Sequence, residues 1–275
     1  MDLLYLQHKQ QKQTPVETTT NQVLNISGLN VIYGSNHAVK DVSFFVNSGE
    51  IFGLLGPNGA GKTSTLSAVE GLLKFNSGTI TVAGNNVIEK PLYARAAMGV
   101  QLQATSFQPE LKVPEILQLY AGIYGVDLTK EMTANLLKEI NLTDAANKRY
   151  GQLSGGQQQR ISLAIATIHD PRLVLLDEPT TGLDPQSRRQ LWERIEAIRE
   201  KGNAVVLTTH SMEEAEAVCD RIGIIDHGKI IAIDTPQALI SKYSGDPEVI
   251  AISRRGKITL EDVFIALTGR EVRSE

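Results

Sequence analysis

The eight residues at positions 56–63, GPNGAGKT, constrain the fold more than any other part of the sequence. They fit the pattern G-x-x-x-x-G-K-[ST], they follow the apolar run IFGLL, and they precede the helical run STLSAVEGLL. The glycines let backbone N–H groups curl around a phosphate, Lys62 brings a positive charge to the β- and γ-phosphates, and the Thr63 hydroxyl can bind Mg²⁺. A glycine-rich turn with a surface lysine is the plainer alternative. The complete pattern between a strand and a helix favours a loop that binds nucleotide phosphates.

Short apolar runs that alternate with helical runs indicate an α/β fold. The runs IFGLLG, GVQLQ, LVLLD, AVVLTT and IGIID are typical of strands covered on both faces. In the run QSRRQLWERIEAIRE, one helical face carries Leu191, Trp192, Ile195 and Ile198, so this helix should lie against the sheet. Near the start, VLNISGLNVIYG and AVKDVSFFVNSGEI favour adjacent antiparallel strands. The sequence predicts a mainly parallel core sheet with an antiparallel β layer.

Two acidic residues stand where the apolar run LVLLD ends: Asp177 is its last residue and Glu178 follows it. A carboxylate at the end of a buried strand can hold Mg²⁺ through water, and the next one can polarise an attacking water molecule. Two solvated acids where a strand reaches the surface are the alternative interpretation. The phosphate-binding loop upstream favours the catalytic one.

Two glycines stand at the start of the helical run that follows QLSGGQQQR, although glycine is a poor helix former. Ser154 can cap this helix and Gln157 can complete a capping box. The cap explains neither Gly155 nor Gly156. Bare glycines at a helix start leave N–H groups open to an anion, at the helix end that favours negative charge.

Composition narrows the class of protein. The 275 residues carry a net charge of −4 and no basic stripe, so we expect no nucleic acid partner. Cys219 is the only cysteine, so no internal disulfide is possible, and it should be a buried small hydrophobe. No apolar run approaches the roughly 20 residues that cross a bilayer. Residues 1–22 are rich in Gln and Thr, and we expect a disordered tail on a soluble, cytoplasmic chain.

With these motifs in order, the chain resembles the nucleotide-binding subunits of ATP-binding cassette (ABC) transporters over about residues 23–238. The resemblance implies a P-loop ABC ATPase domain over residues 23–245, a helical subdomain over about 104–168 and a short C-terminal segment over 246–275. It implies ATP and Mg²⁺ as cofactors, with Asp177 as the Walker B acid and Glu178 as the catalytic glutamate. The ATP-binding residues that it implies are Tyr33, Gly56, Pro57, Asn58, Gly59, Ala60, Gly61, Lys62, Thr63 and Ser64.

The resemblance also accounts for the glycines, because in this family two subunits face each other head to tail. The signature sequence of one subunit then meets the γ-phosphate bound by the other, and a Cβ would hold the backbone away. The residues expected to contact the partner's ATP are Ser154, Gly155, Gly156, Gln157 and Asp184. Glu178, the switch histidine His210 and the glutamine Gln103 are the expected catalytic residues; Thr63, Gln103 and Asp177 are the expected Mg²⁺ ligands.

Four of these assignments have plainer alternatives. Tyr33 could be an ordinary strand tyrosine rather than a platform for adenine, and His210 could be a structural histidine at the end of a strand. Gln101 lies two residues before Gln103, which we prefer because it borders the polar loop ATSFQPE. Asp184 precedes Pro185 and could be only a helix cap, although both roles can hold together.

The rest of the chain bears on the branch of the family. The segment TLEDVFIALTGRE resembles the C-terminal part of cassettes from ABC-2-type exporters. We therefore expect two partners, an integral membrane permease and a second ATPase subunit, which is most simply an identical copy. We also expect the chain to lie at the cytoplasmic face of the cell membrane. A soluble ABC protein that acts on ribosomes or nucleic acid is the alternative. A small-molecule kinase would not explain LSGGQ.

Apolar residues beside Gln103 suggest where that permease docks. Phe107 and Leu111 precede a helical run, PEILQLYAGIYG, on a segment expected to be a loop. An exposed apolar patch rimmed by polar residues marks a partner site. The sequence therefore predicts that Phe107 and Leu111 are exposed and contact a short helix of the membrane subunit.

Overall fold

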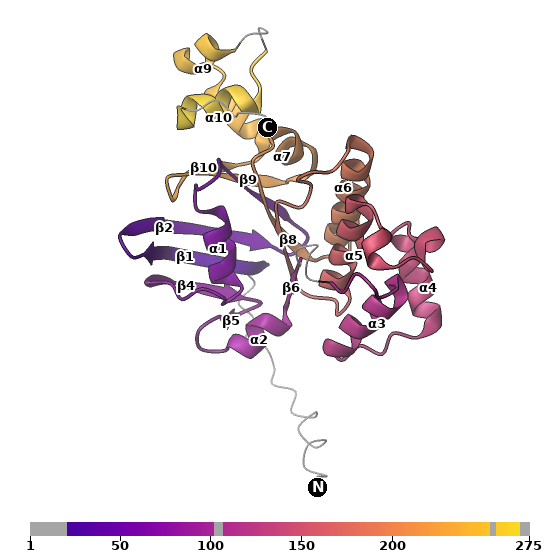
Figure 1. The fold of residues 1–275 in the computed structure, drawn as a ribbon. Coiled ribbons are helices and arrows are strands. Elements are labelled where there is room, and N and C mark those ends of the chain that lie inside the picture. The colour runs from indigo at the N-terminus through magenta and orange to yellow at the C-terminus, as the bar shows by residue number, and fades with distance from the viewer. Residues whose placement is uncertain (1–20, 102–106, 254–256, 270–275) are drawn as a thin grey trace.

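The computed structural model describes residues 21–101, 107–253 and 257–269 (Figure 1). The predicted tail therefore lies almost wholly outside the described residues, and so does Gln103. The strands are β1 (Gln22–Tyr33), β2 (Asn36–Asn47), β3 (Ile51–Leu55), β4 (Ser77–Val82), β5 (Asn85–Asn86), β6 (Met98–Val100), β7 (Leu173–Asp177), β8 (Ala204–Thr209), β9 (Arg221–Asp226) and β10 (Lys229–Asp234). The α-helices are α1 (Lys62–Val69), α2 (Pro91–Ala96), α3 (Val113–Ile123), α4 (Lys130–Glu139), α5 (Gly155–Thr167), α6 (Pro185–Glu200), α7 (Met212–Val218), α8 (Pro236–Tyr243), α9 (Pro247–Ile252) and α10 (Leu260–Thr268).

The predicted antiparallel layer is a four-stranded sheet in the order β2-β1-β4-β5. Strand β1 pairs antiparallel with both β2 and β4, and several register shifts interrupt the pairing. Leu24, Ile26, Leu29 and Val31 of β1 are buried. Apolar residues from these strands, from β3 and from α1 form one core cluster, so this sheet packs directly against the phosphate-binding part of the fold.

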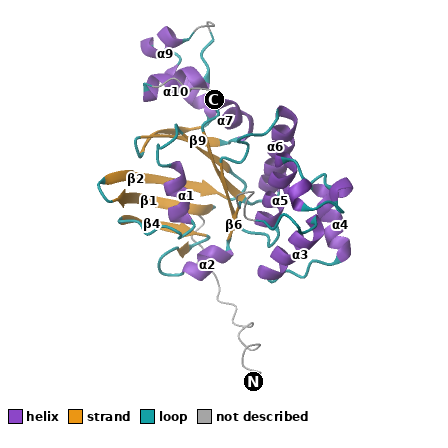
Figure 2. Ribbon diagram, viewed as in Figure 1, coloured by secondary structure: helices purple, strands orange, loops and turns teal. Residues whose placement is uncertain are grey.

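The predicted core sheet has six strands in the order β10-β9-β3-β8-β7-β6. Figure 2 draws the strands in orange and the helices around them in purple. Strand β3 pairs parallel with β8 and β9, β7 pairs parallel with β8 and β6, and only β10 is antiparallel. The α/β fold with a mainly parallel core sheet is confirmed. Because parallel strands share a direction, the carboxyl ends of β3, β7 and β8 meet at one edge, where ligands bind in such sheets.

Helices cover this sheet as the sequence predicts for α6. Leu191, Ile195 and Ile198 of α6 are buried with strands β7 and β8 in a second core cluster. Trp192 is partly buried against the same cluster, and its Nε1 donates to Glu214 Oε1 of α7. Cys219 belongs to this cluster as a buried thiol whose pKa is raised by burial, which confirms it as a small hydrophobe.

Helices α3, α4 and α5 build a third core cluster beside the sheet (Figure 1). Phe107 is part of it: the side chain is only 5% exposed and its ring packs against those of Tyr120 and Tyr150. Leu111 packs partly buried against the same cluster. The prediction that these two residues form an exposed patch is wrong, because the segment before α3 turns its apolar side chains into the helical cluster.

Within the C-terminal run TLEDVFIALTGRE, Leu260–Thr268 form helix α10, which Thr259 caps with Asp262 in a capping box. Leu260 and Phe264 of α10 are buried in the cluster that also holds β8 and α6. Helices α8 and α10 contact each other, and α10 contacts α7. The segment therefore packs on the ATPase core, at the end of the molecule opposite α2 (Figure 1).

Candidate functional site

The loop at residues 56–63 leaves β3 and enters α1 without a side-chain cap. Gly59 and Gly61 have φ angles of 79° and 106°, a region that side chains disfavour. A Cβ on Gly61 would lie 2.6 Å from the carbonyl oxygen of Ala38 on β2, so the loop has no room for one. Gly61 is the N-cap of α1 and offers no side-chain acceptor, so the N–H groups of the first turn are available to an anion.

Neighbouring residues hold this loop in shape. Ala60 is buried, its N–H donates to the carbonyl of Pro57 over 3.1 Å, and its own carbonyl accepts from Gly228 over 3.0 Å. Asn58 and Gly59 lie exposed at the crest of the loop. The N–H of Gly56 donates to the Thr209 carbonyl on β8 over 3.2 Å. The loop is thus fixed to β8 before any phosphate binds.

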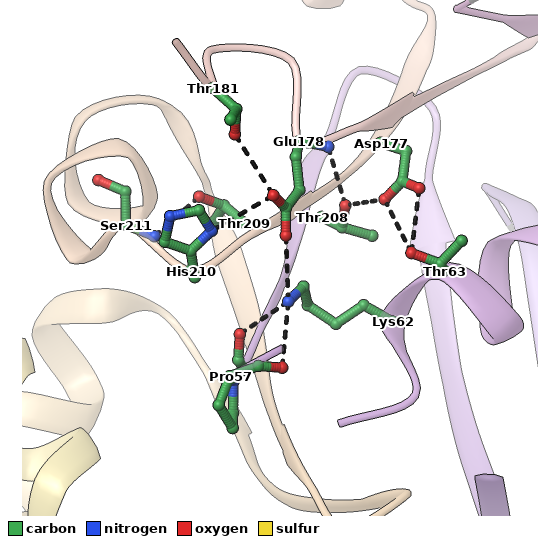
Figure 3. Close-up of polar contacts among 11 residues, drawn as sticks. Pro57, Lys62, Thr63, Asp177, Glu178, Thr181, Thr208, Thr209, His210 and Ser211 are labelled. Atoms are coloured by element: carbon green, nitrogen blue, oxygen red, sulfur yellow. Dashed lines mark hydrogen bonds and ion pairs between the residues drawn. The ribbon is translucent and has the colours of Figure 1, made fainter. Parts of the chain in front are cut away.

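Lys62 lies buried at the centre of the site (Figure 3). Its Nζ donates to the carbonyls of Gly56 over 2.8 Å and Pro57 over 3.2 Å. The same Nζ lies 3.3 Å from Glu178 Oε1. An ammonium group held by carbonyls inside a phosphate-binding loop supplies the charge that the triphosphate needs.

Thr63, in the first turn of α1, meets Asp177 at the end of β7. The Thr63 hydroxyl donates to Asp177 Oδ2 over 3.1 Å, and Thr208 donates to Asp177 Oδ1. Hydroxyl and carboxylate oxygens are the donors that Mg²⁺ prefers, so these side chains fit a Mg²⁺ ion bound together with nucleotide phosphates. The part of the site that Gln103 would supply is outside the described residues.

Glu178 adopts a φ angle of 47°, in the left-handed region, where its N–H donates to Thr208. This turn directs the carboxylate toward Lys62 and His210. His210 Nδ1 lies 3.4 Å from Glu178 Oε2 without the geometry of a hydrogen bond, so the attraction is electrostatic and needs a protonated ring. Burial raises the pKa of Glu178, but Lys62 and His210 lower it by more, so the carboxylate stays ionised and able to accept a proton.

Tyr33 ends β1 beside the phosphate-binding loop. Its ring is 47% exposed and its hydroxyl lies 3.4 Å from the Ser64 hydroxyl of α1. An exposed aromatic face next to the first turn of α1 offers a stacking surface for a base. The structure therefore places Tyr33 beside the phosphate-binding loop, and its stacking on adenine stays a prediction.

The signature residues lie on a different part of the surface. Ser154 is the N-cap of α5, and its capping box with Gln157 is confirmed: Ser154 accepts from Gln157 N–H over 3.3 Å, and Gln157 Oε1 accepts in return over 3.0 Å. Gly155 is exposed, with open space where a Cβ would stand, whereas Gly156 is buried. Among the contacts of the described residues, none joins Ser154 or Gly155 to the phosphate-binding loop of the same chain.

Asp184 caps α6 as predicted from the following proline. Its Oδ1 accepts from the N–H groups of Gln186 over 3.0 Å and Ser187 over 2.9 Å. The Ser187 hydroxyl donates to Oδ2 over 2.6 Å. The hydrogen bonds from Ser187 lower the pKa of the Asp184 carboxyl, so this exposed group is ionised.

The run SMEE at residues 211–214 has the sequence of a capping box, but the box does not form. Ser211 caps α7 by accepting from Glu214 N–H over 3.3 Å, but the Glu214 side chain does not complete a capping box. Glu214 is buried and accepts from Trp192 instead, while the Ser211 N–H donates to Thr209. Tertiary packing on α6 therefore overrides the local motif.

Sequence reasoning missed two residues of the site. Thr208 contacts both acids, and its place opposite Asp177 in the parallel pair β7–β8 was the signal that could have found it. Glu70, at the end of α1, is the other: burial, together with the nearby charge of Asp177, raises the pKa of its carboxyl to about 7. No pattern in the run STLSAVEGLL identifies Glu70.

In this site a glycine-rich loop begins a helix, and a lysine and two acids at the end of a strand converge on it. This arrangement defines a P-loop nucleoside triphosphatase. Residues 39–181 match the family model described as ABC transporter. The chain is 36% identical to the "Nod factor export ATP-binding protein I" of Rhizobium sp. (strain N33), over 90% of this chain and 98% of that protein. It is 40% identical to the "Linearmycin resistance ATP-binding protein LnrL" of Bacillus subtilis (strain 168), over 82% of this chain and 73% of that one.

A solved structure described as "Structure of ATP binding subunit of ABC transporter" superposes with a TM-score of 0.76, at 27% identity over 89% of this chain and 99% of that one. This chain belongs to the ABC transporter family, as an ATP-binding subunit with ATPase activity. In the described ranges, no helix combines the length and apolar character that a membrane span requires.

Proposed function

We propose that this chain powers an ABC exporter by hydrolysing ATP between two cassettes that close on each other. The observation that carries the hydrolytic part is the convergence of Lys62, Asp177 and Glu178 at the carboxyl edge of the parallel sheet. Hydrolysis of a phosphoanhydride needs an ammonium group that binds the phosphates, a carboxylate that binds a metal and a second carboxylate that orients water.

In this proposal each residue at the edge has one task. Lys62 leaves Glu178 and binds the β- and γ-phosphates, which neutralises charge on the leaving group. Glu178 then orients the attacking water and accepts its proton, while His210 and Thr181 hold the carboxylate. Thr63 and Asp177 would hold Mg²⁺ with Gln103, and that ion would offset charge on the phosphate oxygens.

The second cassette is needed because Ser154 and Gly155 are exposed and lie apart from their own phosphate-binding loop. The start of α5 has free N–H groups at the positive end of the helix, which suits the γ-phosphate held by another copy of the chain. Two identical copies placed head to tail would give two complete sites. No nucleic acid enters this arrangement.

A membrane subunit would dock on the surface around α2, at the cytoplasmic face of the membrane. Four large apolar residues are highly exposed here, at 58–77%: Leu72, Ile88, Leu92 and Tyr93. Arg95 of α2 donates to the Gly71 carbonyl over 2.9 Å, which places α2 against the end of α1 and brings Leu72 to the same side. Apolar surface of this kind favours a partner helix.

The exporter branch is favoured over a soluble ABC protein that acts on ribosomes or nucleic acid. Relatives that match 90% and 82% of this chain are named as an export and a resistance ATP-binding protein. The cargo would be selected by the membrane subunit, so this chain supplies only the ATP-driven motion.

The test is to purify the chain from its own cells with its partners. We expect Mg²⁺-dependent ATP hydrolysis and co-purification of one integral membrane protein. Co-purification with ribosomes in place of a membrane protein would overturn the exporter proposal. Absence of ATP hydrolysis in the presence of that membrane protein would overturn the proposal that this chain powers transport.

A further inference from the structure

The second signature glycine, Gly156, packs against the first turn of α6. A Cβ on Gly156 would lie 2.5 Å from Ser187 Oγ and 2.7 Å from Ser187 Cβ, which is closer than carbon atoms approach in proteins. At Gly155, one residue earlier, the same construction meets open space. The two glycines therefore differ: a side chain on Gly155 would meet only what approaches from outside, whereas one on Gly156 would push α5 away from α6.

Ser187 also holds Asp184. Its hydroxyl donates to Asp184 Oδ2 over 2.6 Å and its N–H donates to Oδ1 over 2.9 Å, so one residue occupies both carboxylate oxygens. A carboxylate held by two donors from one residue keeps a single orientation. The side chain of Ser187 thus contacts the signature helix on one side and Asp184 on the other.

Further contacts keep the two helices together below this point. Arg160 of α5 donates to Gln190 of α6, and Gln159 of α5 donates to the Pro179 carbonyl over 2.8 Å, next to Glu178. Arg160 is buried, so the pair lies inside the α5–α6 contact. These contacts join helix α5 to the segment after Glu178 and to α6.

We propose that Ser187 is a positioning residue, which fixes Asp184 relative to the signature helix so that both reach the partner's nucleotide in one arrangement. This inference rests on the proposed function, because Ser154 and Asp184 act there on the ATP of the second cassette. The hydroxyl of Ser187 sets the orientation of Asp184, and the absence of a side chain at Gly156 lets α5 come close enough for the two to be presented together.

The first experiment removes only the hydroxyl. In a Glu178→Gln background, Ser187→Ala should raise the ATP concentration needed for half-maximal dimerisation about three- to tenfold, the usual worth of one such hydrogen bond. ATP binding by the monomer should stay unchanged, since Ser187 makes no contact with its own phosphate-binding loop. Gln186→Ala is the matched control, because Gln186 is exposed and holds Asp184 only through its backbone N–H.

Mixing subunits separates positioning from a purely structural role. In a mixed dimer of one Ser187→Ala subunit and one Lys62→Ala subunit, one site is intact. Its phosphate-binding loop comes from the Ser187→Ala subunit, and the unchanged Ser187 opposite comes from the Lys62→Ala subunit. The KM for ATP at this site should equal that of wild type mixed with Lys62→Ala. A KM that stays raised places the effect inside the mutated subunit and overturns the proposal, as does unchanged dimerisation of Ser187→Ala.

A second pair of variants tests the contact with Gly156. Gly156→Ala should lower the midpoint of urea unfolding, and Gly156→Ala with Ser187→Gly should recover most of that loss, because the clashing atoms are gone. Gly155→Ala should not lower the midpoint, because a Cβ there meets open space and alanine favours a helix more than glycine does. Equal midpoints for Gly156→Ala alone and for the double variant would show that the clash with Ser187 is not the reason for a glycine at position 156. Should Glu178→Gln itself fail to dimerise with ATP, the proposed function fails, and that outcome differs from the failure of Ser187→Ala alone.

Discussion

Lys62 Nζ lies 3.3 Å from Glu178 Oε1, so the phosphate-binding cation and the candidate base are paired in this conformation. Two loop carbonyls complete the surroundings of the ammonium group. Binding of a triphosphate would replace these partners, because phosphate oxygens are stronger acceptors for an ammonium group than carbonyls. We therefore expect nucleotide binding to release Glu178 from Lys62.

Replacing Glu178 with Gln should preserve ATP binding and slow hydrolysis by about 10²-fold or more, the usual loss when a general base is removed. The amide keeps the shape of the side chain but cannot accept the proton of water. Steady-state phosphate release measures the rate, and size-exclusion chromatography with ATP should show an accumulated dimer. Glu193→Gln, an exposed change on α6, is the control. Turnover near wild type would remove Glu178 from the mechanism.

Much of this site was predictable because its motifs are local. The loop at residues 56–63 is a continuous run in which each glycine has a backbone reason, such as the close approach of Ala38 to Gly61. The cap at Ser154 is likewise complete within four residues. Motifs of this kind need no knowledge of tertiary contacts, so sequence reasoning finds them.

The sequence patterns mislead where tertiary packing determines what surrounds a side chain. Phe107 precedes a helix, as predicted, but the rings of Tyr120 and Tyr150 bury it, and Tyr150 is more than forty positions away in the sequence. The Glu214 side chain does not complete the capping box of α7 and accepts a hydrogen bond from Trp192 of α6 instead. The packing of Gly156 against Ser187 also joins two segments that only the fold brings together.

Glu70 should make the stability of the nucleotide-free protein depend on pH. Its carboxyl has a pKa of about 7 in the folded state, against 4.5 in the unfolded chain, so the stabilisation is present below 4.5 and is lost as the pH rises through 7. Glu70→Gln cannot ionise. We expect it to be more stable than wild type at pH 8 by about 1 kcal/mol, after allowance for partial exposure, and equal at pH 4.5. Urea unfolding at both pH values tests this; the same difference at both would exclude ionisation as the cause.

Phe107→Ala should destabilise the protein by about 3 kcal/mol, because it leaves a cavity between Tyr120 and Tyr150. Leu119→Ala, on the exposed side of α3, should change the free energy of unfolding by no more than about 0.5 kcal/mol. Urea unfolding compares the two variants. If Phe107→Ala left stability unchanged and weakened only assembly with a membrane protein, the burial of Phe107 in the helical cluster would be the wrong explanation of its role.

Ser154→Arg should leave the chain folded and able to bind ATP, since Ser154 is exposed and does not contact its own loop. It should block ATP-driven dimerisation, because the bulky cation would occupy the place of the partner's γ-phosphate. Thr129→Arg is a matched control: it also removes an N-cap, worth about 1 kcal/mol, but on α4. Mixing Ser154→Arg with Lys62→Ala should restore one active site. Confirmed mixed dimers without any hydrolysis would argue against sites shared between subunits.

The surface around α2 should bind the membrane subunit. Leu92 and Tyr93 are 77% and 70% exposed, so Leu92→Asp and Tyr93→Asp should leave folding and the ATPase activity of the isolated subunit unchanged. A charge at the centre of an apolar contact should weaken co-purification with the membrane protein about tenfold or more, since such anchors carry most of the binding energy. Ile250→Asp, at a residue that is 55% exposed on α9 at the opposite end of the molecule, controls for a general effect of charge. Co-purification that survives both α2 variants but not Ile250→Asp would move the docking surface to the C-terminal helices.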